Sequence, residues 1–444
     1  MKQFNTTDIG NAERFQEYYN GRVLFVNEPG KWVFWTERLG WQYAKMFMLS
    51  KPVVQSIGNE ASTYEDDNRR VELLKWAKAS EYKSAQRNML DLASHYMGVS
   101  INQFDVKPEL INCQNGVVDL KTRTLIPHSP TQLHLQRTRA HYNPNARCPK
   151  WAKFLSEIFE DNQVLIDWIQ VAAGYSIMGL TKEHHFFVCH GNGRNGKDVF
   201  LETIGYVLGD YLHTAQFETF LQRDQSNLRV LEAIGALKGR RFAIAQETND
   251  STRLDAALIK RLTGGNRLVG TVIGKGRFEF DPTHTIWLAC NHLPAIKDAS
   301  TGMWERVKAI PFGRTFLGDE QNRELKEELK KEADGILAWL VEGAHKYLNR
   351  EPSSLLPDPY VIKEATQEYR DGNDKMSIFI KQHMVKDGVS KTPANVFYNI
   401  YKDWCINNDE FPEEYRFFPS KLKERGVNVK REEHGQLCLG WTNV

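Results

Sequence analysis

The sequence predicts an α/β protein built around a parallel sheet, and two observations lead to this fold class. An apolar run, a glycine-rich turn and a segment with helical periodicity follow one another between Phe186 and Gly209. Short apolar runs, FFVC, FAIA and TIWLAC, recur along the same region, as is typical of buried parallel strands. We therefore expect a parallel sheet whose first strand leads into a phosphate-binding loop.

The glycine-rich turn has the spacing G-x-x-x-x-G-K. Its glycines let the backbone turn tightly, so that N–H groups face an anion to which the helix N-terminus and the lysine add positive charge. A connector that binds nothing is the alternative, and the flanking strand and helix argue against it. The predicted nucleotide-binding residues are Gly191, Asn192, Gly193, Arg194, Asn195, Gly196, Lys197 and Asp198.

Asp198 departs from the usual motif, in which a Ser or Thr hydroxyl holds Mg²⁺. A carboxylate can also bind Mg²⁺, but it places negative charge beside the phosphate oxygens. Either the metal offsets that cost or Asp198 weakens the site.

Polar residues follow the next two apolar runs. Glu247 comes directly after FAIAQ, where a carboxylate can support Mg²⁺ together with Asp198 and act as general base. Asn291 follows TIWLAC and can sense the terminal phosphate or hold the attacking water, although a turn residue is the plainer interpretation. Arg306 can stabilise transition-state charge from a neighbouring subunit, a weak signal by itself.

Two basic features indicate nucleic-acid contacts. VGTVI and RFEF form a predicted β-hairpin with Lys275 at its tip, which suits a phosphate backbone, although in isolation it would be a plain exposed hairpin. A basic stretch near the C-terminus resembles a recognition helix and wing that grip duplex DNA, with a solvated basic face as the alternative. The residues predicted there are Lys421, Lys423, Arg425, Lys430 and Arg431.

Composition bounds the class of protein. The 444 residues suggest about three domains, and the net charge of only +2 means that any nucleic-acid surface is local. No apolar run approaches the roughly 18 residues that span a bilayer, no signal-peptide core is present, and the six scattered cysteines make no zinc pattern. We expect a cytoplasmic protein with no membrane contact, divided into residues 1–145, 146–350 and 360–444.

Local patterns predict elements around this core. Residues 23–35 indicate two strands around a Pro-Gly turn, and 71–97 have helical periodicity with a basic face. Helices are also expected over 151–178 and 335–347. The last domain is expected to hold two helices, a basic segment and a hairpin.

The ordered set of motifs resembles the helicase portion of the phage- and plasmid-type primase–helicases of superfamily 3. The matching segments are TDIGNAERF, NGVVDLKTRTLIPH, CPKWAKFL, the Walker A segment GYSIMGLTKEHHFFVCHGNGRNGKD, QETND for Walker B, KRLTGGN, FDPTHTIWLACNHLP and MWERVKAIPF. The resemblance starts at Thr7, which leaves no room for a polymerase-like primase domain upstream, so the chain is either a stand-alone helicase or a fragment of a longer protein.

The resemblance implies an AAA+-like P-loop ATPase core, with an α+β N-terminal domain and a C-terminal winged-helix-like domain. It implies a homo-hexamer that hydrolyses ATP between subunits and pulls single-stranded DNA through its pore. Lys197 would bind phosphates, Glu247 would serve Walker B, Asn291 would be the sensor, Arg306 the finger in trans, and Lys275 the pore contact. Asp198, Glu305 and Asn266 depart from the family's usual residues.

The predicted function is that of an ATP-dependent DNA helicase of a phage, plasmid or other mobile element. It would unwind duplex DNA during replication in the cytoplasm of a bacterial host. Its expected partners are single-stranded and duplex DNA and a primase or polymerase. The alternative, favoured by Asp198, is a replication initiator whose degraded ATP site acts only as an assembly switch. A small-molecule P-loop kinase would leave the hairpin and the basic C-terminus unexplained.

Overall fold

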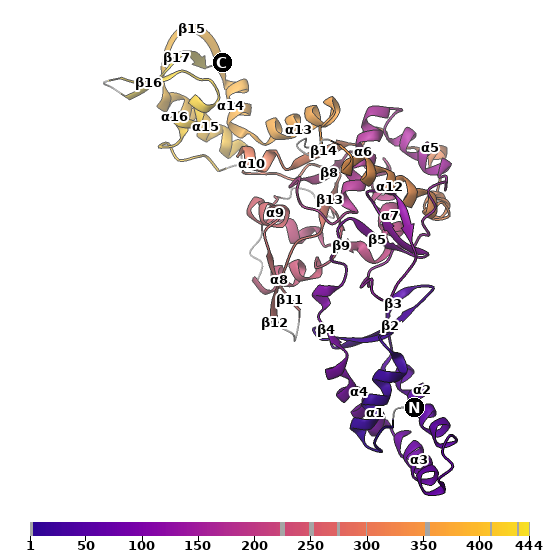
Figure 1. The fold of residues 1–444 in the computed structure, drawn as a ribbon. Helices are drawn as coiled ribbons and strands as arrows, with labels where there is room; N and C mark the ends of the chain where they lie inside the picture. Colours follow the sequence, from indigo (N-terminus) through magenta and orange to yellow (C-terminus); the bar gives the residue numbers. More distant parts are fainter. Residues whose placement is uncertain are drawn as a thin grey trace.

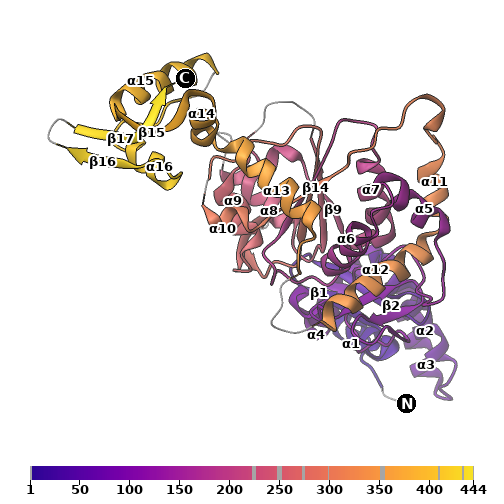
Figure 2. The same ribbon diagram turned by 90° about the horizontal axis from the view of Figure 1, so that it is seen from above.

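The computed structural model describes residues 3–222, 227–247, 253–272, 276–298, 300–350, 356–408, 411–432 and 435–443. A central sheet separates an N-terminal helical part from a C-terminal unit, and these lie at opposite ends of the molecule (Figure 1). The view from above shows the C-terminal unit standing to one side of the core (Figure 2). Within the described residues, no helix is both long and apolar enough to cross a bilayer.

The N-terminal part packs helices around a sheet of order β3-β2-β1-β4. Its strands are β1 (Val23–Val26), β2 (Lys31–Thr36), β3 (Gly40–Tyr43) and β4 (Gly98–Val99), and its helices are α1 (Asp8–Tyr19), α2 (Met46–Ala61), α3 (Asp67–Ser80) and α4 (Lys83–Tyr96). The hairpin over 23–35 is confirmed. The single helical segment expected over 71–97 is instead two helices, because buried Ser80 accepts a hydrogen bond from Asn11 Nδ2 at 2.9 Å and the chain turns there.

A second small sheet joins this part to the core. It consists of β5 (Leu110–Cys113), β6 (Gly116–Asp119) and β7 (Thr124–Ile126), after a short 3₁₀ turn at Ile101–Gln103. Its buried side chains, among them Ile111 and Val118, belong to the same hydrophobic cluster as the central helices. The small sheet therefore packs as an extension of the central core.

The central sheet has five strands in the order β14-β8-β13-β10-β9, and all neighbouring pairs are parallel. They are β8 (Phe186–His190), β9 (Leu212–Thr214), β10 (Phe242–Gln246), β13 (Thr285–Cys290) and β14 (Val307–Pro311). The three strands expected from FFVC, FAIA and TIWLAC are confirmed. Two further strands were not predicted: β9, which is very short, and β14, whose apolar run is interrupted by Lys308.

Helices cover both faces of the sheet. One face carries α5 (Pro149–Ile158), α6 (Gln163–Ser176), α7 (Lys197–Leu208) and α12 (Ala333–Leu348), with α11 (Leu325–Lys330) beside them. The other carries α8 (Asn227–Ala236), α9 (Ala256–Thr263), α10 (Thr301–Trp304) and α13 (Tyr360–Asn373). Alternate residues of a strand pack against the two helical layers. In β8, Phe187 and Cys189 pack against the first layer, and Phe186 and Val188 pack against the second. Further 3₁₀ turns lie at Gly209–Tyr211, Phe217–Phe220 and Gly318–Glu320.

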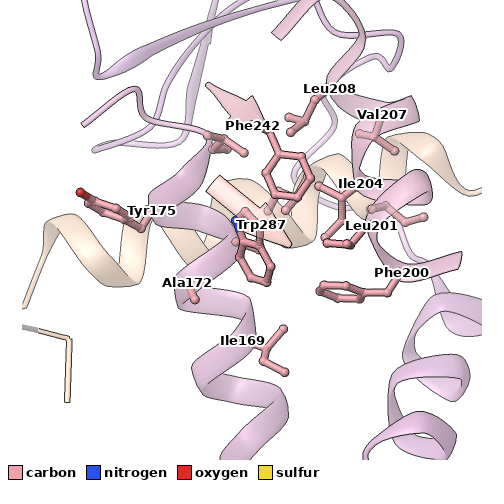
Figure 3. Packing of buried hydrophobic residues seen from close by; sticks show 14 of the residues in the cluster. Ile169, Ala172, Tyr175, Phe200, Leu201, Ile204, Val207, Leu208, Phe242 and Trp287 are labelled. Atoms are coloured by element: carbon pink, nitrogen blue, oxygen red, sulfur yellow. The ribbon is translucent and has the colours of Figure 1, made fainter. Parts of the chain in front are cut away.

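Aromatic packing and close helix contact build the first layer. Trp287 stacks on Phe187 with ring centroids 4.2 Å apart, and α6 and α7 side chains surround it (Figure 3). A Cβ on Gly174 of α6 would lie 2.1 Å from Ala344 N of α12, so glycine is required for these helices to meet. The helix expected over 151–178 is two helices, since Glu160 and Asp161 adopt left-handed φ values of 50° and 57° that end α5.

The predicted hairpin is present as β11 (Leu268–Val272) and β12 (Gly276–Phe280), paired antiparallel. It lies against α8, where a Cβ on Gly235 would come within 2.5 Å of Thr271 O. The tip, with Lys275, lies outside the described residues.

The C-terminal unit has its own core, which contains Phe379, Tyr401 and Phe418. Its sheet has the order β15-β17-β16. The elements are α14 (Lys375–His383), β15 (Met384–Pro393), α15 (Ala394–Asn407), α16 (Phe418–Glu424), β16 (Val429–Glu432) and β17 (Gly435–Asn443). The expected basic segment forms α16, and the expected hairpin is β16 and β17. Strand β15 was not predicted. Three helices, α13 to α15, precede α16, where two were expected. Because Thr366 Oγ1 accepts from Ala309 N at 3.1 Å, α13 packs on the central sheet rather than in this unit.

Candidate nucleotide site

The loop between β8 and α7 is shaped by two glycines with positive φ, Gly191 at 149° and Gly196 at 87°. A Cβ on Gly191 would lie 2.3 Å from Phe312 O, and one on Gly196 would lie 2.7 Å from Ile158 Cγ2. Both positions therefore require glycine, whereas a Cβ on Gly193 would meet nothing within 4 Å. This tight turn places the N-terminus of α7 at the carboxyl edge of the sheet, where parallel folds bind anions.

Lys197, the first residue of α7, folds back into this loop and is only 4% exposed. Its Nζ donates to Gly191 O at 2.6 Å, to Asn195 Oδ1 at 3.1 Å and to Asn291 Oδ1 at 3.3 Å. Burial lowers the pKa of Lys197, while the nearby carboxylate of Asp198 opposes that shift. The ammonium thus sits among oxygen acceptors that phosphate oxygens can replace.

Glu247 follows β10 at the same edge of the sheet. Its carboxylate accepts hydrogen bonds from the backbone N–H groups of Asn291 at 3.0 Å and His292 at 3.4 Å. These N–H groups come from the end of β13, which lies between β10 and β8. The structure therefore brings together three residues predicted from separate segments, Lys197, Asn291 and Glu247.

Asp198 is exposed on the first turn of α7. Glu202 lies one turn further along the same helix. It was not predicted as a site residue, although its i, i+4 spacing from Asp198 places the two carboxylates on the same face of a helix. Glu202 accepts hydrogen bonds from Gln246 Nε2 at 3.3 Å and from Lys326 Nζ at 2.6 Å. It therefore links α7 to the end of β10, beside Glu247.

The residues at this edge fit a Mg²⁺–nucleotide. The described part of the chain contains no group of three or more His, Cys, Asp or Glu side chains arranged for a metal. Mg²⁺ bound to a nucleotide needs only one or two carboxylates, because phosphates and waters fill the remaining positions. Asp198 and Glu247 are the carboxylates that could supply them, and the loop is open at Gly193, where a Cβ would meet nothing within 4 Å.

Arg306 is not brought to this loop. It precedes β14, and because Val307 pairs with Phe186 in a parallel register, Arg306 lies at the amino edge of the sheet. The five residues of β8 put it roughly 16 Å along the strand from the phosphate loop. Its Nε donates to Thr263 Oγ1 at 3.2 Å, and its Nη1 donates to Gly302 O.

The predicted DNA-contact residues of the C-terminal unit fall into two groups. Arg425 is paired with Asp374 at 2.8 Å and Lys421 with Glu413 at 3.3 Å, so both hold the unit's own structure together. Lys423, Lys430 and Arg431 are exposed. Lys386 and Lys391 are also exposed, on β15 of the same sheet. They were not predicted as DNA contacts, because strand β15 itself was not predicted.

Comparisons with known proteins relate parts of the chain to viral proteins and to one protein family. Residues 12–160 match the family described as "D5 N terminal like". The chain is 24% identical over 378 residues to "Putative helicase L207/L206" of Acanthamoeba polyphaga mimivirus, covering 80% of this chain and 39% of that protein. It is 26% identical over 284 residues to "Putative helicase 022R" of Frog virus 3, covering 60% and 29%, and 24% identical over 331 residues to "Putative primase C962R" of African swine fever virus, covering 69% and 34%.

The fold has a counterpart among solved structures. The apo structure of the NrS-1 C-terminal region superposes with a TM-score of 0.51 at 10% identity, covering 96% of this chain and 98% of that one. This likeness concerns the fold alone. The chain spans about a third of the length of the curated relatives it matches. Together the similarities support a relationship to viral proteins named "Putative helicase" and "Putative primase".

Proposed function

We propose that this chain is the ATP-hydrolysing helicase part of a DNA replication protein of a virus, phage or other mobile element. The convergence of Lys197, Asn291 and Glu247 beside a glycine cradle carries the proposal. The relatives named as helicases and primases support the link to DNA. The order and parallel pairing of the central sheet suit an AAA+-like P-loop core, and the C-terminal unit would act as a winged-helix-like DNA-binding domain.

In this proposal Lys197 exchanges its bonds to Gly191, Asn195 and Asn291 for bonds to the terminal phosphates of ATP. Glu247, oriented by the N–H groups of Asn291 and His292, takes the proton of the attacking water. Asn291 orients the water or contacts the terminal phosphate. Mg²⁺, held by Asp198 and Glu247 with the phosphates, would neutralise charge on the leaving group.

The position of Arg306 favours a ring of subunits. An arginine at the amino edge of its sheet is far from the phosphate loop of its own subunit. It could therefore serve catalysis only at the phosphate loop of a neighbouring subunit. A closed ring, which we propose is a homo-hexamer, meets this requirement at every interface. The hairpin of β11 and β12 would then contact single-stranded DNA within the ring through Lys275.

The experiment is an ATPase and strand-separation assay with and without single-stranded DNA. We expect Mg²⁺-dependent hydrolysis that DNA stimulates, and a loss of at least about two orders of magnitude in rate for Lys197→Ala and for Glu247→Gln. Wild-type turnover no faster than that of these variants would contradict the motor function.

A replication initiator with a switch-like ATP site is the second candidate, and Asp198 at the usual hydroxyl position favours it. In that case ATP would promote assembly on duplex DNA without turnover. Asp198→Ser would then speed hydrolysis, whereas in a working motor Asp198→Ala would raise the Mg²⁺ concentration needed for half-maximal rate.

A further inference from the structure

The five residues that follow β14, Phe312 to Phe316, run along the phosphate loop. Phe312 N–H donates to His190 O at 2.8 Å, and its carbonyl lies 3.4 Å from Asn195 Nδ2. At the other end, Phe316 N–H donates to Arg194 O at 2.9 Å. The segment is therefore attached at both ends to the loop proposed to hold the phosphates.

Arg314 lies midway between these two attachments. An extended chain spans at most about 3.6 Å per residue, so its Cα is within roughly 7 Å of the Cα atoms of Phe312 and Phe316. Its guanidinium carbon lies 4.7 Å from the centre of the Phe316 ring. The cation is thus supported by the ring of Phe316, the residue whose N–H is bonded to the phosphate loop.

The bonds that hold Arg314 are easily exchanged. Its Nη2 lies 3.4 Å from Glu320 Oε1, and the two side chains are 37% and 52% exposed. An exposed ion pair of this kind contributes little to stability. Phosphate oxygens accept two N–H bonds from a guanidinium, so a bound nucleotide can replace the Glu320 carboxylate.

We infer that Arg314 is a second phosphate-binding cation, which acts in cis on the terminal phosphate of the nucleotide held by Lys197 of the same subunit. This inference rests on the proposed ATP site. It differs from the role given to Arg306, which lies at the opposite edge of the sheet and would serve a neighbour.

Equilibrium binding of fluorescent ATP and ADP to the full chain tests the inference. Arg314→Ala should weaken ATP binding about tenfold and ADP binding much less, because the lost contact is to the terminal phosphate. Glu320→Gln should preserve or tighten ATP binding, since it frees the guanidinium. Arg323→Ala, at an exposed arginine beyond this segment, is the matched control and should change neither affinity.

Subunit mixing separates action in cis from action in trans. Arg306→Ala mixed with Lys197→Ala should recover ATPase activity, because some interfaces pair an intact loop with an intact finger. Arg314→Ala mixed with Lys197→Ala should not, because every site then lacks one of its own two cations. Recovery in the second mixture would overturn the assignment in cis.

The outcomes distinguish the inference from the function on which it rests. If Lys197→Ala abolishes ATP binding while Arg314→Ala leaves it unchanged, or if Arg314→Ala weakens ATP and ADP equally, the assignment of Arg314 is wrong and the ATP site stands. If the wild type binds ATP no better than Lys197→Ala, both the proposed function and the inference fail. Arg314→Lys, which keeps the charge but loses the planar fork, should fall between wild type and alanine.

Discussion

At the scale of single residues, burial sets the chemistry of the candidate site. Lys197 is almost fully enclosed, and its pKa is lowered because desolvation disfavours the ammonium. Asn291 is exposed and Glu247 half-buried, and Asn291 Oδ1 accepts from Lys197 Nζ at 3.3 Å. The buried ammonium is the group that would attract an anionic ligand, which would take the place of such oxygen acceptors.

Burial also predicts a response to acid at His284, which is 3% exposed at the start of β13. Desolvation lowers its pKa from 6.5 to about 4. The unfolded imidazole binds a proton near pH 6.5 and the folded one only near pH 4, so stability is complete above this window and is lost as the pH falls through it. The loss by pH 5 amounts to about 2 kcal/mol.

Thermal unfolding at pH 7 and pH 5 measures this effect. The drop in Tm on acidification should be smaller in His284→Gln than in the wild type. His95→Gln, at an exposed histidine of α4, should show the wild-type drop. An equal drop in all three proteins would mean that His284 does not contribute to acid sensitivity.

At the scale of elements, Thr263 joins three parts of the core. It ends α9, and a short connection over residues 264–267 leads to the hairpin strand β11. Its hydroxyl donates to Ile259 O at 2.8 Å and accepts from Arg306 Nε at 3.2 Å. Its carbonyl lies 2.8 Å from His184 Nδ1. The proposed finger is therefore held by the last residue of α9, shortly before the hairpin of β11 and β12 begins.

We expect Thr263 to position Arg306 rather than to contact nucleotide. Thr263→Val keeps the volume but removes the acceptor, so DNA stimulation of ATP hydrolysis should fall severalfold while ATP binding stays within about twofold of wild type. Thr263→Ser restores the hydroxyl and should recover most of the stimulation. Equal loss in the two variants would indicate a packing role.

At the scale of the whole molecule, the separate core of the C-terminal unit predicts that it can be removed. The cut belongs after Asn373, because α13 packs on β14 and Asn373 Oδ1 accepts from Ile296 N at 2.7 Å. Deleting residues 374–444 should weaken duplex binding, since Lys423, Lys430 and Arg431 leave with it, and should spare much of the ATPase activity.

Lys275→Ala is the matched opposite change. It should leave duplex binding intact while strand separation and DNA-stimulated hydrolysis fall, because this contact would lie inside the ring. Binding titrations at several salt concentrations, with parallel unwinding assays, compare the two proteins. The same loss of duplex binding in both would contradict a division of labour between the hairpin and the C-terminal unit.

The sequence by itself determined those features that depend on neighbours along the chain. A buried parallel strand is a short apolar run, so three central strands were found, and the glycine pattern after Cys189 located the turn between β8 and α7. The hairpin of β11 and β12 followed from two strand-like runs around a Gly-Lys-Gly turn. In each case a short stretch carries both the propensity and the turn chemistry.

Tertiary structure alone decided which distant residues meet. Two segments with continuous helical periodicity each form two helices. The break near Ser80 accompanies a hydrogen bond from Asn11, and the break at Glu160 accompanies a left-handed turn. Neither follows from the periodicity of the sequence. The strand β14 fixes Arg306 at one edge of the sheet and Arg314 at the other, yet the two lie close together in the sequence. Because β14 runs between them, the two arginines lie at opposite edges of the sheet, and no local sequence pattern predicts this placement.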